Sequence, residues 1–312
     1  MAKSVSIIKI EDGRDNVKKK VYDAVRTAME NANWKDHILP DEKTLLKVNM
    51  CWADFLLPGM CTSPWVLGAV IETIQDHVGE ILVGEGMASA FQSFDVGCKN
   101  NRWDRTCKEY DVKLIDLAKD EYMQIDATDL GVPFPITLSK LTVDIPNVIS
   151  LPMMKTHSVT TFTGALKNQF GISFGKRITY HLHLAPVIVA INRTVKANFV
   201  VMDATIGMEG NGPTNGIPKE KDLILASADL VGLDATACRI MNIDPENVEY
   251  IKLANKIGLG GIYPEIVGNV RIEDVKENFV CAQPQGYYEK GMLPLLKNKF
   301  LKNIIYNYFW IP

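Results

Sequence analysis

Short apolar runs rich in β-branched residues alternate with helical patterns along most of this chain. In the first half, the runs typical of buried strands are residues 4–10, 44–50, 80–86 and 112–117. Segments with the spacing of amphipathic helices lie between them, at 16–32 and 63–77. Strands that alternate with helices need crossover connections, which produce a twisted, largely parallel sheet with helices on both faces. We therefore predict an α/β fold.

The same alternation resumes after residue 140. Strand patterns cover 147–154, 197–204 and 222–229, and the last leads into a helical pattern at 230–241. Two helix starts are clear, because Ser63 precedes Pro64 and Asp229 precedes the later helix, and both Ser and Asp are good N-caps.

These two halves predict two lobes with a cleft between them, the alternative being one sheet with an elaborate insertion. The predicted units are an N-terminal α/β lobe at 1–140, a second α/β lobe at 141–284 and an aromatic, basic tail at 285–312. We expect the tail to pack on the body, to seal a homo-oligomer interface or to touch a membrane surface.

Charge and composition exclude several classes of function. The formal net charge is -3, whereas a nucleic-acid-binding domain is usually basic, so we expect no nucleic-acid partner. The first residues do not resemble a signal peptide, and no apolar run is long enough to cross a bilayer. We therefore predict a cytoplasmic protein without a transmembrane segment.

The usual metal and nucleotide motifs are absent from the sequence. The six cysteines form no CxxC pair, which is the common spacing for structural zinc and for iron–sulfur clusters. No GxxxxGK[ST] motif occurs, which argues against a nucleoside triphosphatase.

One long stretch carries bases but no acids. Between Ile145 and Met202 there is no Asp or Glu. Lys155 and His157 directly follow an apolar run, and ligands of open α/β sheets bind beyond the carboxyl ends of strands. Thr156 and the nearby glycines can free backbone N–H groups for an anion. The stretch predicts a carboxylate or phosphate site, the alternative being a solvated basic face.

Further candidate residues come from neighbouring strand ends. Lys47 and Asn49 alternate on one face of a strand, and Glu85 ends the next strand, so Lys47 and Glu85 form either part of the site or a structural ion pair. The candidate substrate-binding residues are Lys47, Asn49, Glu85, Lys155, Thr156, Lys167, Asn168 and Arg177.

Carboxylates return after the strand pattern at 197–204. Asp203 ends that run, and Glu209 lies in a stretch rich in Gly, Asn and Pro. The two could form an acid/base pair or half of a metal site, whereas the alternative for Asp203 is a turn that accepts backbone hydrogen bonds.

Several of these stretches together resemble a known family. "LPMMKTHSVTTFTGALKNQFG", "VVMDATIGMEGNGP", "LLKVNM" and "ILVGEG" are similar to the bacterial and archaeal family of domain of unknown function 362. Members often carry ferredoxin-type iron–sulfur modules, whose cysteine clusters this chain lacks. The family name records no activity, so the resemblance implies membership without a reaction.

A second resemblance concerns one lysine and the histidines after it. The Gly-Ala-Leu-Lys stretch that ends at Lys167 is followed by His181 and His183. This is similar to the nickel-pincer lactate racemase family, in which a lysine holds the nickel cofactor and a later histidine ligates the metal. The resemblance implies that Lys167 would anchor a cofactor, with His157, His181 and His183 as metal ligands or proton-transfer groups. Apart from this resemblance, the residues predict no cofactor and no metal.

We predict an enzyme that acts on a small, carboxylate-bearing anion by acid/base chemistry such as isomerisation, elimination or bond cleavage. The candidate catalytic residues are His157, His181, Asp203 and Glu209. Two alternatives stay open: a non-catalytic module that binds an anionic metabolite, and a redox or racemase protein with a nickel-pincer-like cofactor or an iron–sulfur partner.

Overall fold

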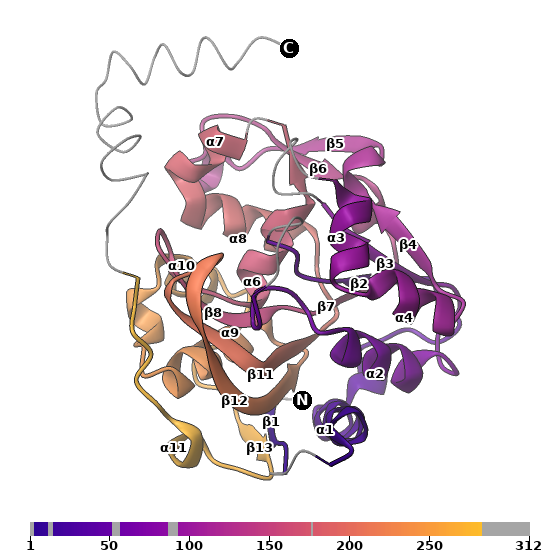
Figure 1. The fold of residues 1–312 in the computed structure, drawn as a ribbon. Coiled ribbons are helices and arrows are strands. Elements are labelled where there is room, and N and C mark those ends of the chain that lie inside the picture. Colours follow the sequence, from indigo (N-terminus) through magenta and orange to yellow (C-terminus); the bar gives the residue numbers. More distant parts are fainter. Residues whose placement is uncertain (1–2, 12–14, 52–56, 87–92, 176, 283–312) are drawn as a thin grey trace.

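A computed structural model describes residues 3–11, 15–51, 57–86, 93–175 and 177–282 of the 312-residue chain (Figure 1). Within these residues, ten strands form one sheet in the order β13-β1-β12-β11-β7-β2-β3-β4, and β8 joins β11 and β9 beside that path. The strands of this sheet are β1 (Val5–Lys9), β2 (Thr44–Lys47), β3 (Ile81–Glu85), β4 (Lys113–Asp116), β7 (Asn147–Ser150), β8 (Met153–His157), β9 (Thr161–Thr163), β11 (Phe199–Asn211), β12 (Asn215–Ser227) and β13 (Ile266–Gly268).

Most neighbouring strands of this sheet are parallel. The pairs β11–β7, β7–β2, β2–β3 and β3–β4 are all parallel, and β8 is parallel to β11. Strand β12 runs against both of its neighbours, β1 and β11, and β9 runs against β8. The predicted α/β fold with a largely parallel sheet is confirmed.

Helices cover both faces of the sheet. The helices of the described residues are α1 (Val17–Asn31), α2 (Pro64–Ile74), α3 (Phe94–Asn100), α4 (Trp103–Glu109), α5 (Leu141–Asp144), α6 (Ala165–Asn168), α7 (Arg177–Tyr180), α8 (Leu184–Thr194), α9 (Leu230–Ile240), α10 (Glu249–Lys256) and α11 (Ile272–Val275). The expected N-caps are present, since Ser63 Oγ accepts from Trp65 N at 3.1 Å and Asp229 Oδ1 accepts from Gly232 N at 2.9 Å.

Alternate residues of the central strands pack into two separate cores. On β11, Phe199 and Val201 belong to the core shared with α1, α2, α3 and α4. Val200 and Met202 belong to the core shared with α8, α9 and α10. Successive side chains of a strand point to opposite faces, so one continuous apolar strand can serve both layers. Burial of each such side chain contributes about 1.5–3 kcal/mol.

The expected division into two lobes is not confirmed. Strands β1 to β4 come from the first predicted lobe and β7, β8, β11 and β12 from the second, yet all belong to the same sheet. A smaller sheet in the order β10-β6-β5 lies beside it, built from β5 (Tyr122–Ile125), β6 (Ile136–Ser139) and β10 (Ser173–Phe174). This arrangement matches the alternative of one sheet with an insertion. The boundaries at 140 and 284 stay predictions, and the tail at 285–312 lies outside the described residues.

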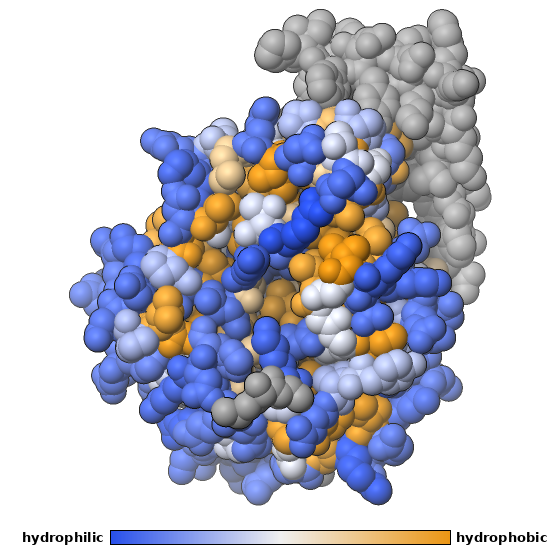
Figure 2. Space-filling view, turned by 180° about the vertical axis from the view of Figure 1, so that it is seen from behind, coloured by the Kyte–Doolittle hydropathy of each residue, from blue (hydrophilic) through white to orange (hydrophobic). Residues whose placement is uncertain are grey.

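The surface of the described residues is mixed in character. On the face shown in Figure 2, hydrophilic residues alternate with separate groups of hydrophobic ones. In the part of the chain that the structure describes, no helix combines the length and the apolar character needed to cross a membrane.

Candidate functional site

The carboxyl ends of the central parallel strands meet at one edge of the sheet. In the observed register, Lys47 of β2 lies opposite Gly84 of β3 on one side and Ser150 of β7 on the other. Ligands of such sheets bind beyond this edge, and several of the predicted residues lie here.

Lys47 and Glu85 form a fully buried ion pair. Lys47 Nζ lies 2.7 Å from Glu85 Oε1 and donates to the Val48 carbonyl at 2.9 Å. The Glu85 carboxylate also accepts from the backbone N–H groups of Met50 and Gly86, at 3.0 and 2.8 Å. The pair therefore fixes the backbone directly after β2 and β3. Of the two alternatives for Lys47 and Glu85, these contacts match the structural ion pair.

Asn49, Asn168 and Lys155 form a second polar network beside that pair. Asn168 Nδ2 donates to the Lys47 carbonyl at 3.1 Å and to Ser150 Oγ at 3.0 Å, and Asn168 Oδ1 accepts from Asn49 Nδ2 at 3.0 Å. Asn49 Oδ1 in turn accepts from Lys155 Nζ at 2.9 Å. The network fixes the side chains of both asparagines.

The ammonium group of Lys155 is almost completely buried, and none of its hydrogen-bond partners among the described residues is a carboxylate. Besides Asn49, it donates to the Met60 carbonyl at 2.8 Å and to Cys51 Sγ at 2.9 Å. A buried ammonium is costly unless its hydrogens are all bonded. Lys155 therefore anchors Asn49, Cys51 and Met60 and adds positive charge to the site.

The short helix α6 is held in place by a carboxylate from another part of the chain. Asp234 Oδ1 accepts from Ala165 N at 2.6 Å and Asp234 Oδ2 accepts from Leu166 N at 3.0 Å. Burial raises the pKa of Asp234 from 3.8 to about 7, against the opposing effect of these two hydrogen bonds. A Cβ atom at Gly164 would lie 2.2 Å from Asp234 Oδ1, so the contact requires glycine there.

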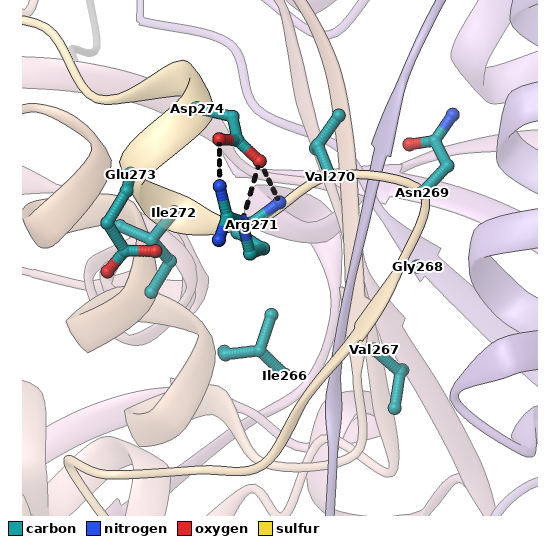
Figure 3. Close-up of a pocket in the computed structure, with 9 residues that line it drawn as sticks. All are labelled: Ile266, Val267, Gly268, Asn269, Val270, Arg271, Ile272, Glu273 and Asp274. Atoms are coloured by element: carbon teal, nitrogen blue, oxygen red, sulfur yellow. Dashed lines mark hydrogen bonds and ion pairs between the residues drawn. The ribbon is translucent and has the colours of Figure 1, made fainter.

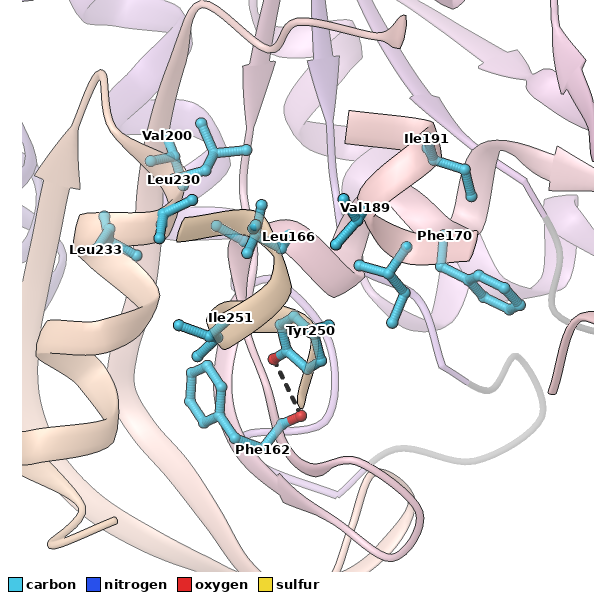
Figure 4. Packing of buried hydrophobic residues seen from close by; sticks show 14 of the residues in the cluster. Phe162, Leu166, Phe170, Val189, Ile191, Val200, Leu230, Leu233, Tyr250 and Ile251 are labelled. Atoms are coloured by element: carbon cyan, nitrogen blue, oxygen red, sulfur yellow. Dashed lines mark hydrogen bonds between the residues drawn. The ribbon is translucent and has the colours of Figure 1, made fainter. Parts of the chain in front are cut away.

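Apolar packing completes the support of α6. Leu166 packs within the cluster that contains Phe162, Tyr250 and Ile251, and Tyr250 Oη donates to the Phe162 carbonyl at 3.1 Å (Figure 4). The cap and this packing together orient Lys167 and Asn168, which follow on the same helix.

His157 is buried and electrically neutral. Its Nδ1 accepts from the backbone N–H groups of Val159 and Thr160, at 3.0 and 3.2 Å, so the ring carries its proton on Nε2. Burial lowers the pKa of His157 well below 6.5, and the nearby Lys167, His181 and Lys155 lower it further. No hydrogen bond within the described part of the chain occupies Nε2.

Four of the predicted residues are thus gathered at one place: Lys155, His157, Lys167 and His181. Lys167 and His181 share an aromatic neighbour, since Phe170 has its ring centre 5.6 Å from Lys167 Nζ and 5.5 Å from the His181 ring centre. The stretch without acids therefore supplies a cluster of cationic and protonatable groups.

Asp203 does not join this cluster. Its Oδ2 accepts from Ser63 N at 2.9 Å, and its Oδ1 accepts from the backbone N–H and hydroxyl of Thr205 at 3.1 and 2.7 Å. Burial raises the pKa of Asp203, and no lysine or histidine contributes to that shift. The carboxyl group therefore holds the start of α2, which is the turn-type role among the alternatives.

Glu209 is also apart from the cluster and from Asp203. Strand β11 continues to Asn211, so both residues lie on one irregular strand, with register shifts between Asp203 and Met208. Glu209 instead bonds Lys219 Nζ at 3.1 Å and Val280 N at 3.0 Å. The structure does not bring these two carboxylates together as an acid/base pair, because the stretch rich in Gly, Asn and Pro that contains Glu209 continues the strand.

The other predicted residues have separate surroundings. Thr156 Oγ1 donates to the Gly210 carbonyl at 2.9 Å and so joins β8 to β11. The side chain of Arg177 lies outside the described residues. The His183 ring packs edge-on against Phe134, with ring centres 5.6 Å apart.

Among the residues that the structure describes, no three His, Cys, Asp or Glu side chains gather in a way that could hold a metal ion. His181 and His183 each contact a different aromatic ring.

Sequence reasoning missed several contributors to the site. Asp234 and Ser150 are not among the site residues that the sequence predicts. The signal for Asp234 was its position among apolar residues on the buried side of α9. A carboxylate at such a position needs a donor from elsewhere in the chain.

A shallow hollow of about 510 Å³ lies far along the chain from these residues (Figure 3). It is lined by the single stretch 266–274, in which Arg271 and Asp274 bond to each other at 2.8 Å. It contains none of the predicted residues and is not a candidate site.

Comparisons with known proteins agree with the resemblance seen in the sequence. The family described as "Domain of unknown function (DUF362)" matches residues 44–239, a range that includes Lys155, His157, Lys167 and His181. The thylakoid-associated protein sll1697 of Synechocystis sp. is 26% identical over 275 residues, covering 85% of this chain and 83% of that protein.

Among solved structures, the fold is similar to that of the lactate racemase apoprotein from Thermoanaerobacterium thermosaccharolyticum. The sequence identity is 11% and the TM-score is 0.44. The similarity covers 77% of this chain and 57% of the racemase chain, so this chain spans little more than half of that protein.

Proposed function

We propose that this chain, which belongs to the DUF362 family, is an enzyme that binds a small carboxylate-bearing substrate beside α6 and moves a proton on it. The observation that carries the proposal is the neutral His157, whose Nε2–H is its remaining donor and which lies among Lys155, Lys167 and His181. A cluster of cationic and protonatable side chains favours an anionic ligand.

In this proposal His157 donates a hydrogen bond. Because its Nδ1 is occupied by two backbone N–H groups, the ring is held as a donor through Nε2. A neutral imidazole of this kind stabilises negative charge that develops on a substrate oxygen. This refines the sequence-based role, in which His157 itself moved the proton.

The remaining roles follow from charge and position. Lys167, at the end of α6, pairs with the substrate carboxylate, and His181 accepts or returns the proton. Lys155 does not pair with the substrate, because its own hydrogens are held by Asn49, Cys51 and the Met60 carbonyl. Its charge favours the anionic substrate without direct contact.

Hydrogen exchange in D2O tests the chemistry without knowledge of the final product. The protein is incubated with a panel of 2-hydroxy, 2-amino and dicarboxylic acids, and loss of the C–H signal next to each carboxylate is followed by NMR. We expect exchange in at least one acid, reduced more than about 100-fold in His157→Gln and in Lys167→Ala, the range typical of one lost catalytic group.

Lys196→Ala is the matched control. Lys196 belongs to the same acid-free stretch but is exposed, so its removal should leave exchange unchanged. Binding of an acid, measured by calorimetry, without exchange of any C–H would support the non-catalytic binding module instead. Exchange that persists in the His157 and Lys167 variants would contradict the proposed site.

Localisation and oligomeric state are the subjects of two further proposals. We propose that the protein is cytoplasmic. The relative sll1697 is described as thylakoid-associated, so cell fractionation, which separates soluble from membrane-associated protein, is the test. We also propose that the tail at 285–312 mediates homo-oligomer formation. Light scattering of the full chain and of a chain ending at 282 would test this.

A further inference from the structure

Two adjoining hollows lie on the face of the sheet that α1, α2 and α4 cover. The larger has a volume of about 560 Å³, within the range of small-molecule sites, and the smaller a volume of about 190 Å³. Pro64, Trp65 and Arg102 line both hollows. These three residues therefore form the boundary that a ligand spanning the two hollows would contact.

The wall of the larger hollow is mainly apolar. Trp65 is 42% exposed, so its ring is available to a ligand. The polar groups Asp203 and Ser63 are bonded within the protein, to Thr205, to each other and to Trp65. The apolar lining residues are Ile10, Val17, Val21, Leu57, Met153 and Ile206. This hollow suits the aromatic or aliphatic body of a ligand.

The larger hollow has charges of both signs. Glu220 and Asp222 line it together with Arg102, and Asp222 Oδ2 lies 3.5 Å from Lys9 Nζ. Neither of these acids lines the smaller hollow. The larger hollow therefore selects a ligand by apolar contact, and any selection by charge must come from the smaller one.

The smaller hollow has an excess of positive charge. Lys18, Arg102, Arg105 and Glu109 line it, and Lys18 Nζ lies 3.5 Å from Glu109 Oε1. Within the described part of the chain, neither Arg102 nor Arg105 forms an ion pair. The two arginines are three positions apart at the start of α4, a spacing that places them on one side of the helix. Two guanidinium groups are thus left for an anion.

The backbone of Arg102 supports a role for its side chain. Its φ angle of 59° is in the left-handed region, which glycine and asparagine adopt more easily than arginine. A residue that its own backbone conformation disfavours is a candidate for a functional side chain. The guanidinium group is always charged and matches the oxygens of a phosphate with two parallel hydrogen bonds.

We propose that the two hollows together bind a phosphate monoester with an aromatic or short aliphatic body. The body packs against Trp65 and the apolar wall, and the phosphate oxygens accept from Arg102 and Arg105. A phosphate monoester carries nearly two negative charges at neutral pH, which matches two guanidinium groups. The site is independent of the chemistry proposed at α6.

Three probes separate the two parts of the ligand. They are 2-phenylethyl phosphate, 2-phenylethanol, which lacks the phosphate, and inorganic phosphate, which lacks the body. Each is titrated into the full chain and followed by calorimetry. We expect the ester to bind about tenfold more tightly than either of the other two, because only the ester contacts both hollows.

Three variants assign the contacts. Arg102→Asn and Arg105→Gln should each weaken binding of the ester about fivefold to tenfold and leave binding of the alcohol unchanged. Trp65→Ala should weaken binding of both. Because asparagine adopts the left-handed conformation more easily than arginine, the Arg102 variant is expected to fold.

Two control variants test the location of the site. Lys108→Gln removes an exposed base of α4 that lines neither hollow, and it should leave all affinities unchanged. Lys167→Ala should also leave them unchanged, which separates this site from the proposed function.

Four results would overturn the proposal. They are the absence of ester binding, binding of the alcohol or of inorganic phosphate as tight as that of the ester, ester binding that survives the Arg102→Asn, Arg105→Gln double variant, and an equal loss in Lys108→Gln. The last would mean that the net charge of the surface, and not these two arginines, attracts the phosphate.

Discussion

Replacing Asp234 with Asn tests whether one buried carboxyl group sets the pH range in which α6 is stable. Asp234 accepts from Ala165 N and Leu166 N and has no exposed surface. Burial raises its pKa from 3.8 to about 7. Between these two values the folded chain binds a proton at this position that the unfolded chain has lost.

The sign and size of the effect follow from linkage. A raised carboxyl pKa gives stability that is fully present below the unfolded value of 3.8 and is lost as the pH rises through the folded value of about 7. Each pKa unit corresponds to about 1.4 kcal/mol, so the loss is about 4 kcal/mol. Asn cannot ionise, and the Asp234→Asn variant should lack this decline.

Urea unfolding at pH 5, 7 and 8.5, followed by circular dichroism, measures the difference. At pH 5 the variant should be the less stable protein or close to the parent, because Asn has one acceptor oxygen for the two N–H groups of Ala165 and Leu166 and so loses one of the two hydrogen bonds. From pH 5 to pH 8.5 the parent should lose about 3 kcal/mol of stability relative to the variant, because about two pKa units of the decline lie above pH 5.

Asp203→Asn is the necessary control, since burial raises the pKa of Asp203 in the same direction. The double variant should show both effects added, because these carboxyl groups have no shared partners. Parallel pH profiles for the parent and Asp234→Asn would refute the reasoning. They would mean that Asp234 is already ionised in the folded chain at ordinary pH.

Three other predictions concern single contacts. Glu85→Gln removes the carboxylate that pairs with the buried Lys47 ammonium and should lower the free energy of unfolding by about 3–5 kcal/mol. Adding Lys47→Met should recover part of this loss. Equal stability of the single and double variants in urea would contradict the prediction. Gly164→Ala places a Cβ atom 2.2 Å from Asp234 Oδ1 and should cost about 1–3 kcal/mol in the same assay, and an unchanged unfolding midpoint would mean that the contact is not close. In ¹⁵N NMR spectra at pH 6, His157 should be neutral with its proton on Nε2. Its contribution to stability should be complete above pH 6.5 and should fall as the pH drops below that value. A charged ring at pH 6 would count against the assignment.

The sheet could be predicted because local patterns carry most of its information. The runs at 44–50 and 80–86 are apolar and β-branched, and they form β2 and β3 as expected. The pairing of Lys47 with Glu85 also followed, since a buried lysine at a strand end needs a nearby carboxylate.

The hairpin of β11 and β12 could not be predicted in the same way. Residues 215–221 are polar and contain proline, so they do not have a strand pattern. They form strand because they pair with the continuation of β11, with Met208 opposite Pro218 and Glu209 opposite Ile217. The partner strand, and not local composition, determines this structure, and for that reason Glu209 was misplaced.

The hydrogen-bond partners of the site residues could not be predicted from the sequence, for a related reason. His157 was expected to transfer protons, but its role depends on which backbone groups its Nδ1 meets in the turn after β8. The cap of α6 by Asp234 joins residues that are 69 positions apart. Such contacts leave no periodic signal.

The asparagine network makes the site a late product of folding. Asn168 reaches Lys47 across 121 positions of the chain and Asn49 across 119, while Lys155 reaches Asn49 across 106. Contacts between such distant positions close slowly, because the chain must lose much of its freedom before they form. A ribosome-bound or truncated chain that ends before residue 168 cannot assemble this site. Ligand binding there would therefore report that synthesis and folding have passed residue 168.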